Sequence, residues 1–380
     1  MNFVLTKEQE FVRKMVRDFA KNEVEPIAAE IDRDHRFPVE NVAKMSKLGI
    51  MGVPFPREYG GAGGDNISYA ITIEELSRVC ASTGVICSAH TSLCCWPIYS
   101  WGTEKQKKKY LPRLLSGGKL GAFGLTEASA GTDAAGQQTK AEDKGDHWLI
   151  NGSKLFITNG GYADIFVIFA MTDKKKGPKG ISAFIVEKGF EGFSVGKTED
   201  KMGICASSTT ELIMQNCRVP KENILGDPGD GFKIAMSTLN GGRIGIASQA
   251  LGIAQGAFDV TIAYMKGRKQ FGKKLSQMEA LQFDVANMRT QIEAARLMIY
   301  RAVDMKDRNL NYGPYSAMAK LFAAETAMYV TTKAVQLHGG YGYTKDYPVE
   351  RMMRDAKITE IYEGTSEVQK IVIAAAVFGK

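Results

Sequence analysis

Apolar residues in the first third of the chain recur at helical spacing. Between residues 12 and 19 this spacing predicts a helix, and Gly49 and Pro54 then interrupt the pattern. The glycine-rich stretch REYGGAGGD predicts a loop, and a second helical segment follows at 68–79. Because no run here alternates like a sheet, we expect the first third to be helical.

The pattern changes near Gly121 to short runs that are typical of β-strands. These runs are HWLINGSKLFIT, ADIFVIFAM, GISAFIVEKG and STTELIMQNCRV. Within the first run, the pair Asn151-Gly152 predicts a hairpin turn. The middle of the chain is therefore expected to form a β domain.

Helical spacing returns after Pro220 in three long segments, at 231–265, 278–308 and 316–337. No internal repeat is apparent, so the order of helices, strands and helices sets the architecture. We expect an α+β fold with an N-terminal helical domain, a middle β domain and a C-terminal helical bundle. The expected bounds are 1–118, 119–228 and 229–380.

The stretch EIYEGTSEVQ near the end of the chain crowds three carboxylates around a glycine. Ser366 and Gln369 have the spacing of a capping box, and apolar residues follow at helical period, so a helix is predicted to start at Ser366. Glu363 then lies just outside the helix beside Gly364. It either complements the helix dipole or is aimed at a ligand.

Composition excludes several classes of protein. The chain has 380 residues, and 44% are hydrophobic, which is ample for two or three domains. The charged N-terminus lacks the apolar core of a signal peptide and no stretch has the length of a membrane span, so we expect a cytoplasmic protein without membrane contact. Six cysteines without a C-x-x-C pair and four scattered histidines favour neither disulfides nor a metal site.

The formal charge of +7 is weak evidence about ligands. Its local peaks, EKQKKKY and DKKKGPKG, are short and lack interleaved aromatic residues, so nucleic-acid binding ranks last. A polyphosphate ligand such as a nucleotide or coenzyme A would suit a mildly basic surface.

Three short motifs lack the context that their chemistry needs. GFSVG at 192–196 matches a nucleophile elbow but no helix follows, so a structural strand or turn is favoured. Glu191 stands where a P-loop ending in GKT would begin with glycine, and YGGAGGD lacks the third glycine of a Rossmann fingerprint.

Several stretches, read together, resemble one family across nearly the whole chain. They are GLTEASAGTD (124–133), NGSKLFITNG (151–160), RVPKENILG (218–226), GRIGIASQALGIAQGAFD (242–259), RKQFGK (268–273) and QLHGGYGYTKDYPVERMMRDAKITEIYEGTSE (336–367). The resemblance is to the acyl-CoA dehydrogenases, FAD-containing enzymes that oxidise an acyl-CoA thioester to its trans-2-enoyl form. Among them the short-chain, or butyryl-CoA, dehydrogenases are most similar.

The resemblance implies that Glu363 is the catalytic base. It would take the α-proton while the β-hydrogen leaves as hydride to flavin N5, and its own backbone N–H would help to polarise the thioester carbonyl. Some branches of the family carry the base immediately before the arginine of GGRIGIA. Gly242 stands there in this chain, so the base is expected at 363.

The resemblance also implies a set of FAD contacts. In the β domain these are Phe123, Leu125, Thr126, Gly131, Thr132, Phe156, Ile157 and Thr158. In the C-terminal part they are Arg268, Phe271, Glu279, Gln336, Leu337, Gly339, Gly340, Thr365 and Glu367, of which Arg268 and Phe271 would reach the FAD of a neighbouring subunit. Glu279 stands where many relatives have glutamine, which is a departure from the family pattern at this FAD contact.

The implied substrate contacts are Thr132, Asn240, Arg243, Tyr362, Gly364 and Trp96. Asn240 stands where aspartate is usual, and Cys205 where arginine is frequent. Trp96 lies in the region that forms the floor of the acyl pocket, so a bulky ring there would favour an acyl chain of about four carbons. Plain helix packing explains Trp96 equally well.

We therefore expect a homotetrameric, FAD-dependent short-chain acyl-CoA dehydrogenase that passes electrons to an electron-transferring flavoprotein. The tetramer and the partner rest on the resemblance alone. The same residues would serve an enoyl-CoA reductase that runs the reverse reaction with an electron-transferring flavoprotein, of the ordinary or the bifurcating kind. An oxidase or a non-catalytic acyl-CoA- or flavin-binding protein is a more distant alternative.

Overall fold

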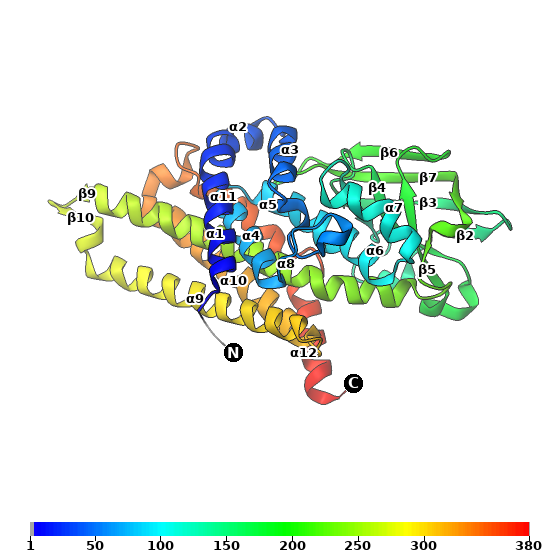
Figure 1. The fold of residues 1–380 in the computed structure, drawn as a ribbon. Helices are drawn as coiled ribbons and strands as arrows, with labels where there is room; N and C mark the ends of the chain where they lie inside the picture. The colour runs from blue at the N-terminus through cyan, green and yellow to red at the C-terminus, as the bar shows by residue number, and fades with distance from the viewer. Residues whose placement is uncertain (1–3, 380) are drawn as a thin grey trace.

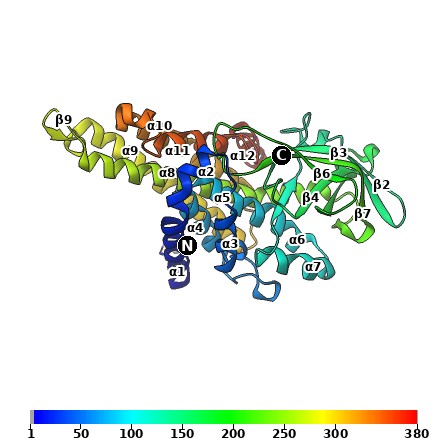
Figure 2. The same cartoon turned by 90° about the horizontal axis from the view of Figure 1, so that it is seen from above.

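The computed structural model describes residues 4–379 and consists of a β-sheet at one end and helices over the rest of the molecule (Figures 1 and 2). The helix α8, Gly231–Gly267, starts against the sheet and runs through the helical part. Helices from both ends of the sequence pack around α8. The α+β arrangement expected from the order of patterns is confirmed.

The N-terminal part is helical, as predicted. Its α-helices are α1 Lys7–Phe19, α2 Ala28–Arg33, α3 Val39–Lys47, α4 Asn66–Ser77, α5 Ala81–Ser88, α6 Trp96–Trp101 and α7 Glu104–Leu115. A π-helical segment, Ala89–Cys95, joins α5 to α6. Side chains cap several of these helices; Thr6 and Gln9 form a capping box at α1, and Asp65 accepts from the Ser68 N–H at α4.

The middle part forms a mixed eight-stranded sheet with strand order β6-β7-β3-β2-β4-β5-β8, and β1 pairs in parallel with β4. The strands are β1 Gly121–Gly124, β2 Lys140–Asp143, β3 His147–Thr158, β4 Ile165–Met171, β5 Ile181–Glu187, β6 Phe193–Thr198, β7 Thr209–Pro220 and β8 Ile224–Leu225. All four predicted runs contain strands, and most of the GFSVG motif lies in β6, which agrees with a structural role.

The predicted hairpin at Asn151-Gly152 is wrong. Both residues lie inside β3, which continues across them with a register shift against β7 between Ile150 and Gly152. Gly152 has φ 145°, and a Cβ there would lie 2.5 Å from Thr139 Oγ1 on the neighbouring segment. The glycine therefore serves a close approach at a strand irregularity and not a chain reversal.

The C-terminal part confirms the three long helices: α8, α9 Glu279–Asp307 and α10 Gly313–His338. The hairpin strands β9 Lys269–Gln270 and β10 Lys273–Lys274 join α8 to α9. The last helices are α11 Val349–Lys357 and α12 Ser366–Phe378. Helix α12 begins at Ser366 as predicted, but its cap is Thr365, whose Oγ1 accepts from the Val368 N–H at 3.3 Å.

Glycines let α8 approach α4 closely. A Cβ at Gly252 would lie 2.3 Å from the Glu74 carbonyl oxygen, and one at Gly256 would lie 2.0 Å from that of Arg78. No larger residue fits at either position without moving a helix backbone. The shared face of α4 and α8 is therefore fixed by backbone contact, which sets the direction of α8 relative to the N-terminal helices.

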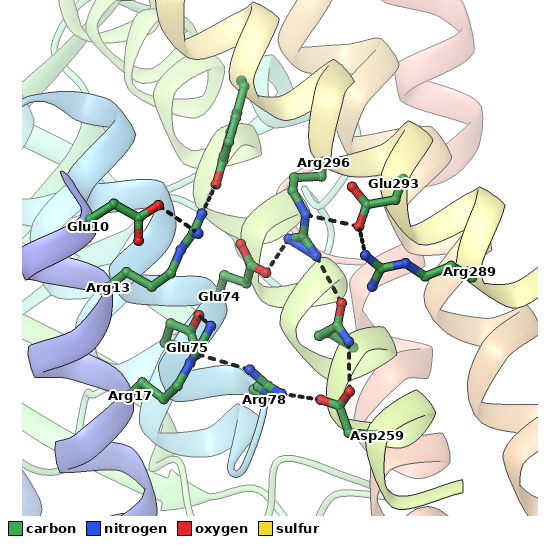
Figure 3. A network of polar contacts seen from close by, with 12 residues as sticks. Glu10, Arg13, Arg17, Glu74, Glu75, Arg78, Asp259, Arg289, Glu293 and Arg296 are labelled. Atoms are coloured by element: carbon green, nitrogen blue, oxygen red, sulfur yellow. Dashed lines mark hydrogen bonds and ion pairs between the residues drawn. The ribbon is translucent and has the colours of Figure 1, made fainter. Parts of the chain in front are cut away.

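A network of charged side chains also joins α1, α4, α8 and α9 (Figure 3). Its centre is Glu74 and Glu75 on α4, which are both buried. Arg296 of α9 pairs with Glu74, and Arg17 of α1 pairs with Glu75 at 2.6 Å. Buried carboxylates require such partners, so the network ties the N-terminal helices to the C-terminal bundle.

Within residues 4–379, no helix is long and apolar enough to cross a membrane. All six cysteines are buried and unbridged.

Candidate active site

Glu363 lies in the short turn between α11 and α12, and its backbone is left-handed. Its φ is 53°, and Gly364 follows with φ 96°. Glycine adopts such angles freely, whereas a glutamate rarely does. Two successive left-handed residues bring the chain out of α11 and into α12 within a few positions. The strained residue is the one that the sequence singled out as chemically active, as is common in functional sites.

The carboxyl group of Glu363 is buried and incompletely hydrogen-bonded. Its Oε2 atom has no hydrogen-bond partner among residues 4–379. Burial raises the pKa of Glu363 from its ordinary 4.5 to about 7, and the nearby positive charges of Lys320 and Arg243 limit that rise. The group is therefore a carboxylate that can accept a proton near neutral pH.

Helix α8 faces this carboxyl group with the stretch Asn240–Arg243. Arg243 is 5% exposed, and its Nη1 donates to Asn240 Oδ1 at 2.7 Å, while its Nε has no partner in the part of the chain described. A Cβ at Gly242 would lie 2.0 Å from Glu363 Oε2. The structure thus brings the predicted base together with Asn240 and Arg243, and the absence of a side chain at 242 leaves room for the base.

Two donors hold the Glu363 turn, and the sequence analysis assigned neither of them to the site. Lys320 on α10 donates from Nζ to the Gly364 carbonyl oxygen at 2.8 Å, and Gln369 on α12 donates from Nε2 to the same oxygen at 2.7 Å. Lys320 is 0% exposed. A signal for it existed, since it stands at helical spacing with buried Ala317 and Ala324, where a lysine needs a partner.

Tyr362 and Trp96 contact the surroundings of this turn in different ways. The Tyr362 hydroxyl donates to Gln249 Oε1 on α8. Trp96 is partly buried, with the Lys306 ammonium 4.2 Å from its ring centroid. Leu93, three residues earlier, comes within 2.9 Å of the Cβ position at Gly242. The segment that carries Trp96 therefore reaches the base. The Trp96 ring also packs against a buried hydrophobic cluster, as expected if its role is helix packing.

The two flavin-facing segments predicted in the β domain lie side by side. The Leu155 N–H donates to the Thr126 carbonyl at 2.8 Å, which joins the Phe123–Thr126 segment to the end of β3. Phe156 in β3 has φ 59° and is 61% exposed, whereas Ile157 is buried. Thr158 is partly buried. An exposed aromatic ring in a strained conformation suits stacking on a flat ligand.

A buried ion pair joins β3 to the loop after β1. Lys154 Nζ donates to Glu127 Oε1 at 2.7 Å and to the Leu125 carbonyl oxygen at 3.0 Å. The carbonyl of Leu125 is therefore occupied, and its N–H lacks a partner among residues 4–379. Gly131 and Thr132 are exposed in the loop that follows.

A second group of predicted cofactor residues lies at the opposite end of the molecule, where β9 and β10 project (Figure 1). A cavity of about 610 Å³ is formed there at the end of α10. Five of the predicted cofactor residues line it: Arg268, Gln336, Leu337, Gly339 and Gly340. Other residues of its lining, which were not predicted, are Tyr264, Tyr341, Asp284 and Asp346. One chain does not bring these residues to the β-domain segments.

The remaining predicted cofactor residues are separate from that cavity. Phe271 forms the hairpin tip and is 96% exposed, and Glu279 is exposed at the start of α9. Thr365 uses its hydroxyl to cap α12, and Glu367 is exposed in the first turn of that helix.

Sequence models of one family match almost the whole chain. They describe the acyl-CoA dehydrogenase N-terminal domain, which matches residues 6–118, the middle domain, which matches 122–217, and the C-terminal domain, which matches 229–378. The chain belongs to the acyl-CoA dehydrogenase family. The recognised resemblance and the fold class expected from it are confirmed.

Two bacterial proteins are similar to this chain over nearly their full length. A protein of Clostridium acetobutylicum named "Acyl-CoA dehydrogenase, short-chain specific" is 65% identical over 378 residues and covers 100% of both chains. The "Acryloyl-CoA reductase (NADH)" of Anaerotignum propionicum is 51% identical, over 99% of this chain and 96% of its own.

Solved structures agree with this assignment. Butyryl-CoA dehydrogenase from Megasphaera elsdenii superposes with a TM-score of 0.98 at 51% identity and covers 100% of both chains. A chain from structural work on the electron transferring flavoprotein of Acidaminococcus fermentans and flavin-based electron bifurcation has a TM-score of 0.99 at 54% identity, again over 100% of both chains.

Members of this family are FAD-dependent oxidoreductases that act on a CH–CH group, and the residues present fit FAD. Arg268 can grip a pyrophosphate with paired donors, and Tyr264 and Tyr341 offer aromatic surfaces in the same cavity. A Cβ at Gly339 or Gly340 would meet no atom within 4 Å, so the cavity is open beside both glycines. Phe156 offers a face for a flavin ring at the sheet.

Proposed function

We propose that this acyl-CoA dehydrogenase oxidises short acyl-CoA thioesters of the butyryl type to trans-2-enoyl thioesters. The observation that carries the proposal is the buried Glu363 carboxyl group, whose pKa is raised to about 7 beside two cationic side chains. An α-proton of a thioester is weakly acidic, so its removal needs a positioned base of this kind in a site that excludes water.

The residues around Glu363 have complementary proposed roles. The carboxylate takes the α-proton, and the Glu363 N–H, which donates to no group of residues 4–379, is available to the thioester carbonyl. Arg243, fixed by Asn240, anchors polar groups of the substrate arm. When bound, FAD supplies the acceptor for the β-hydrogen, which leaves as hydride. Tyr362, Gly364 and Thr132 complete the proposed substrate contacts.

The FAD contacts are proposed in two groups that match the two ends of the molecule. The β-domain group, Phe123 to Thr158, would hold the flavin ring, and Thr365 and Glu367 would approach it from α12. The group from Arg268 to Gly340, which includes Phe271 and Glu279, would hold the pyrophosphate and adenine of the FAD bound to a neighbouring copy. This division supports a homotetramer, in which each cofactor is shared between chains.

We further propose that the protein is cytoplasmic, that electrons leave through an electron-transferring flavoprotein, and that its domains span 1–118, 119–228 and 229–380. The full-length similarity to a chain from work on such a flavoprotein supports the partner. The family matches, which lie within these three ranges, support the bounds.

An enoyl-CoA reductase is the second candidate function. The similarity to an acryloyl-CoA reductase is consistent with this alternative. Because forward and reverse reactions share one transition state, Glu363 would then give its proton to the α-carbon, and no residue would change its position. The physiological direction depends on the potential of the partner.

An anaerobic titration tests the proposed function. The purified, FAD-containing protein is mixed with butyryl-CoA, and the flavin absorbance is followed. We expect butyryl-CoA to bleach the flavin of wild type. In Glu363→Gln the bleaching rate should be at least about 100-fold lower, because the amide cannot accept the proton.

Acyl-CoA thioesters of increasing chain length test the pocket in the same assay, with Trp96→Ala as the variant. If Trp96 closes the pocket, its removal extends the range to longer chains. A wild type that binds FAD but is bleached by none of these thioesters would contradict the proposed function, whereas an unchanged length profile in Trp96→Ala would contradict only the role of Trp96.

A further inference from the structure

Lys320 is a charged residue in a place where charge is costly. Its side chain is 0% exposed within α10, among alanines. Burial lowers the pKa of Lys320 to about 8, against the opposing effect of Glu363. The other charged groups that act on it are Arg243, Glu360 and Glu367. A buried ammonium needs hydrogen-bond partners. Among residues 4–379, Lys320 Nζ donates to the Gly364 carbonyl oxygen at 2.8 Å.

The carbonyl that Lys320 contacts belongs to the most strained part of the site. Glu363 and Gly364 are both left-handed, at φ 53° and 96°. Such a conformation persists in a glutamate only when surrounding contacts determine it. Two contacts converge here, from Lys320 on α10 and from Gln369 on α12, which donates to the same oxygen at 2.7 Å. They fix the Gly364–Thr365 peptide, one residue after Glu363, from two different helices.

We propose that Lys320 is the positioning residue for the catalytic turn: its ammonium pins the Gly364 carbonyl, so that the Glu363 carboxylate and the Glu363 N–H face the substrate together. The proposal rests on the proposed function, in which both groups act on one thioester. Lys320 does not act on substrate or cofactor directly. It acts through the backbone of Gly364, which follows the base Glu363.

The position of Lys320 has a second effect, on charge. Its ammonium and the Arg243 guanidinium are the cations that favour the ionised form of Glu363 against burial. Tyr69 and Tyr362 also face this carboxylate, and both carry hydroxyls whose pKa is raised by burial, so they stay neutral. Loss of Lys320 would thus both release the turn and make the base harder to ionise.

The first test is Lys320→Met, which keeps the length of the side chain and removes the donor and the charge. Stopped-flow bleaching by butyryl-CoA separates the limiting rate from the apparent affinity. We expect the limiting rate to fall about 100-fold, because a displaced base loses its alignment, while the affinity changes little and FAD stays bound. Lys320→Arg, which retains charge and donors, should recover part of the rate.

Infrared difference spectra between pH 5 and pH 9 give a readout that needs no turnover. The band of the protonated Glu363 carboxyl is assigned by its absence in Glu363→Gln. In wild type the band should titrate near pH 7. In Lys320→Met the midpoint should rise by about one unit, because an opposite charge has been removed.

Gln369→Leu separates geometry from charge. It removes the second donor to the Gly364 carbonyl without removing a charge, so the limiting rate should fall while the Glu363 midpoint stays in place. Lys44→Met, on helix α3, is the matched control: it removes a lysine ion pair with Glu23 outside the site and should leave both readouts unchanged.

A wild-type limiting rate and a wild-type infrared midpoint in Lys320→Met would overturn the proposal. If Lys320→Met does not fold, a wild-type limiting rate in Gln369→Leu, which removes the other donor to the same carbonyl, would overturn it instead. Failure of the proposed function is a separate result: butyryl-CoA then fails to bleach wild type, while the infrared midpoints still show whether Lys320 governs Glu363.

Discussion

A carboxylate that removes a proton from a carbon acid must be more basic than a carboxylate in water. At Glu363 burial provides this basicity, and Lys320 and Arg243 keep the group ionisable. Without these cations, the same burial would raise the pKa of Glu363 further and favour the protonated form. The balance between desolvation and two positive charges therefore sets the pH range in which the base can act.

The first prediction at this scale concerns the pH dependence of butyryl-CoA oxidation. We expect kcat/KM to rise as pH increases through about 7, because the ionised fraction of Glu363 rises there. Steady-state rates between pH 5.5 and 8.5 measure this midpoint. A midpoint near the ordinary value of 4.5 would contradict it.

Stability provides the control, because the folded-state pKa of Glu363 lies above its unfolded value. The group contributes stability below pH 4.5, and this contribution is lost as pH rises through about 7. The stability of Glu363→Gln minus that of wild type should therefore be larger at pH 8 than at pH 5. Thermal unfolding of both proteins at a fixed protein concentration measures this difference.

Single residues were predictable where a long motif contained them. The YEG sequence identified Glu363 through its resemblance to a family, and GGRIGIA identified Arg243. Lys320 was not singled out because its role depends on a carbonyl 44 residues away in sequence. Likewise the cap of α12 is Thr365 and not Ser366, since the choice between adjacent hydroxyls depends on the backbone angles of the preceding turn.

At the scale of elements, periodicity predicted the long helices and most strands, because each pattern is repeated many times along an element. The Asn151-Gly152 pair shows the opposite case. Two residues carried that prediction, and the same glycine also suits a strand where a neighbour passes closely. Thr139, from another strand region, decides between the two, and no local pattern contains that contact.

The contact of α8 with α4 gives a prediction about glycine. Gly256→Ala should destabilise the protein by about 1–3 kcal/mol, because its Cβ would lie 2.0 Å from the Arg78 carbonyl oxygen and the helices would have to separate. Gly267→Ala, at the end of the same helix, meets no atom within 4 Å and should be neutral or slightly stabilising. Denaturant unfolding of both variants measures the difference, and equal effects would contradict the role of close packing.

At the scale of the whole molecule, the charged network of Figure 3 joins helices from the two ends of the chain. No sequence pattern predicts this network, since its members are spread from Glu10 to Arg296 and each looks like an ordinary surface charge. Burial of Glu74 and Glu75 makes the difference, and burial is a property of the assembled helices.

Removal of Arg296 tests this network. Arg296→Met leaves Glu74 buried without its closest cation, so we expect a loss of about 3–5 kcal/mol in the free energy of unfolding. Glu74→Gln should restore part of that loss in the double variant. Arg289→Met is the control, because its pair with Glu293 is exposed and should contribute less than about 1 kcal/mol. Similar losses in both arginine variants would argue against a special role for burial.

The far cavity at Arg268 has a consequence for how the protein acquires its cofactor. Helix α8, whose 37 residues span roughly 55 Å, starts against the sheet and ends at that cavity. In the proposed tetramer, each chain contributes residues to two different FAD sites, and each FAD site needs residues from two chains. Cofactor retention then follows mass action between chains, and dilution below the assembly concentration would release FAD from protein that is still folded.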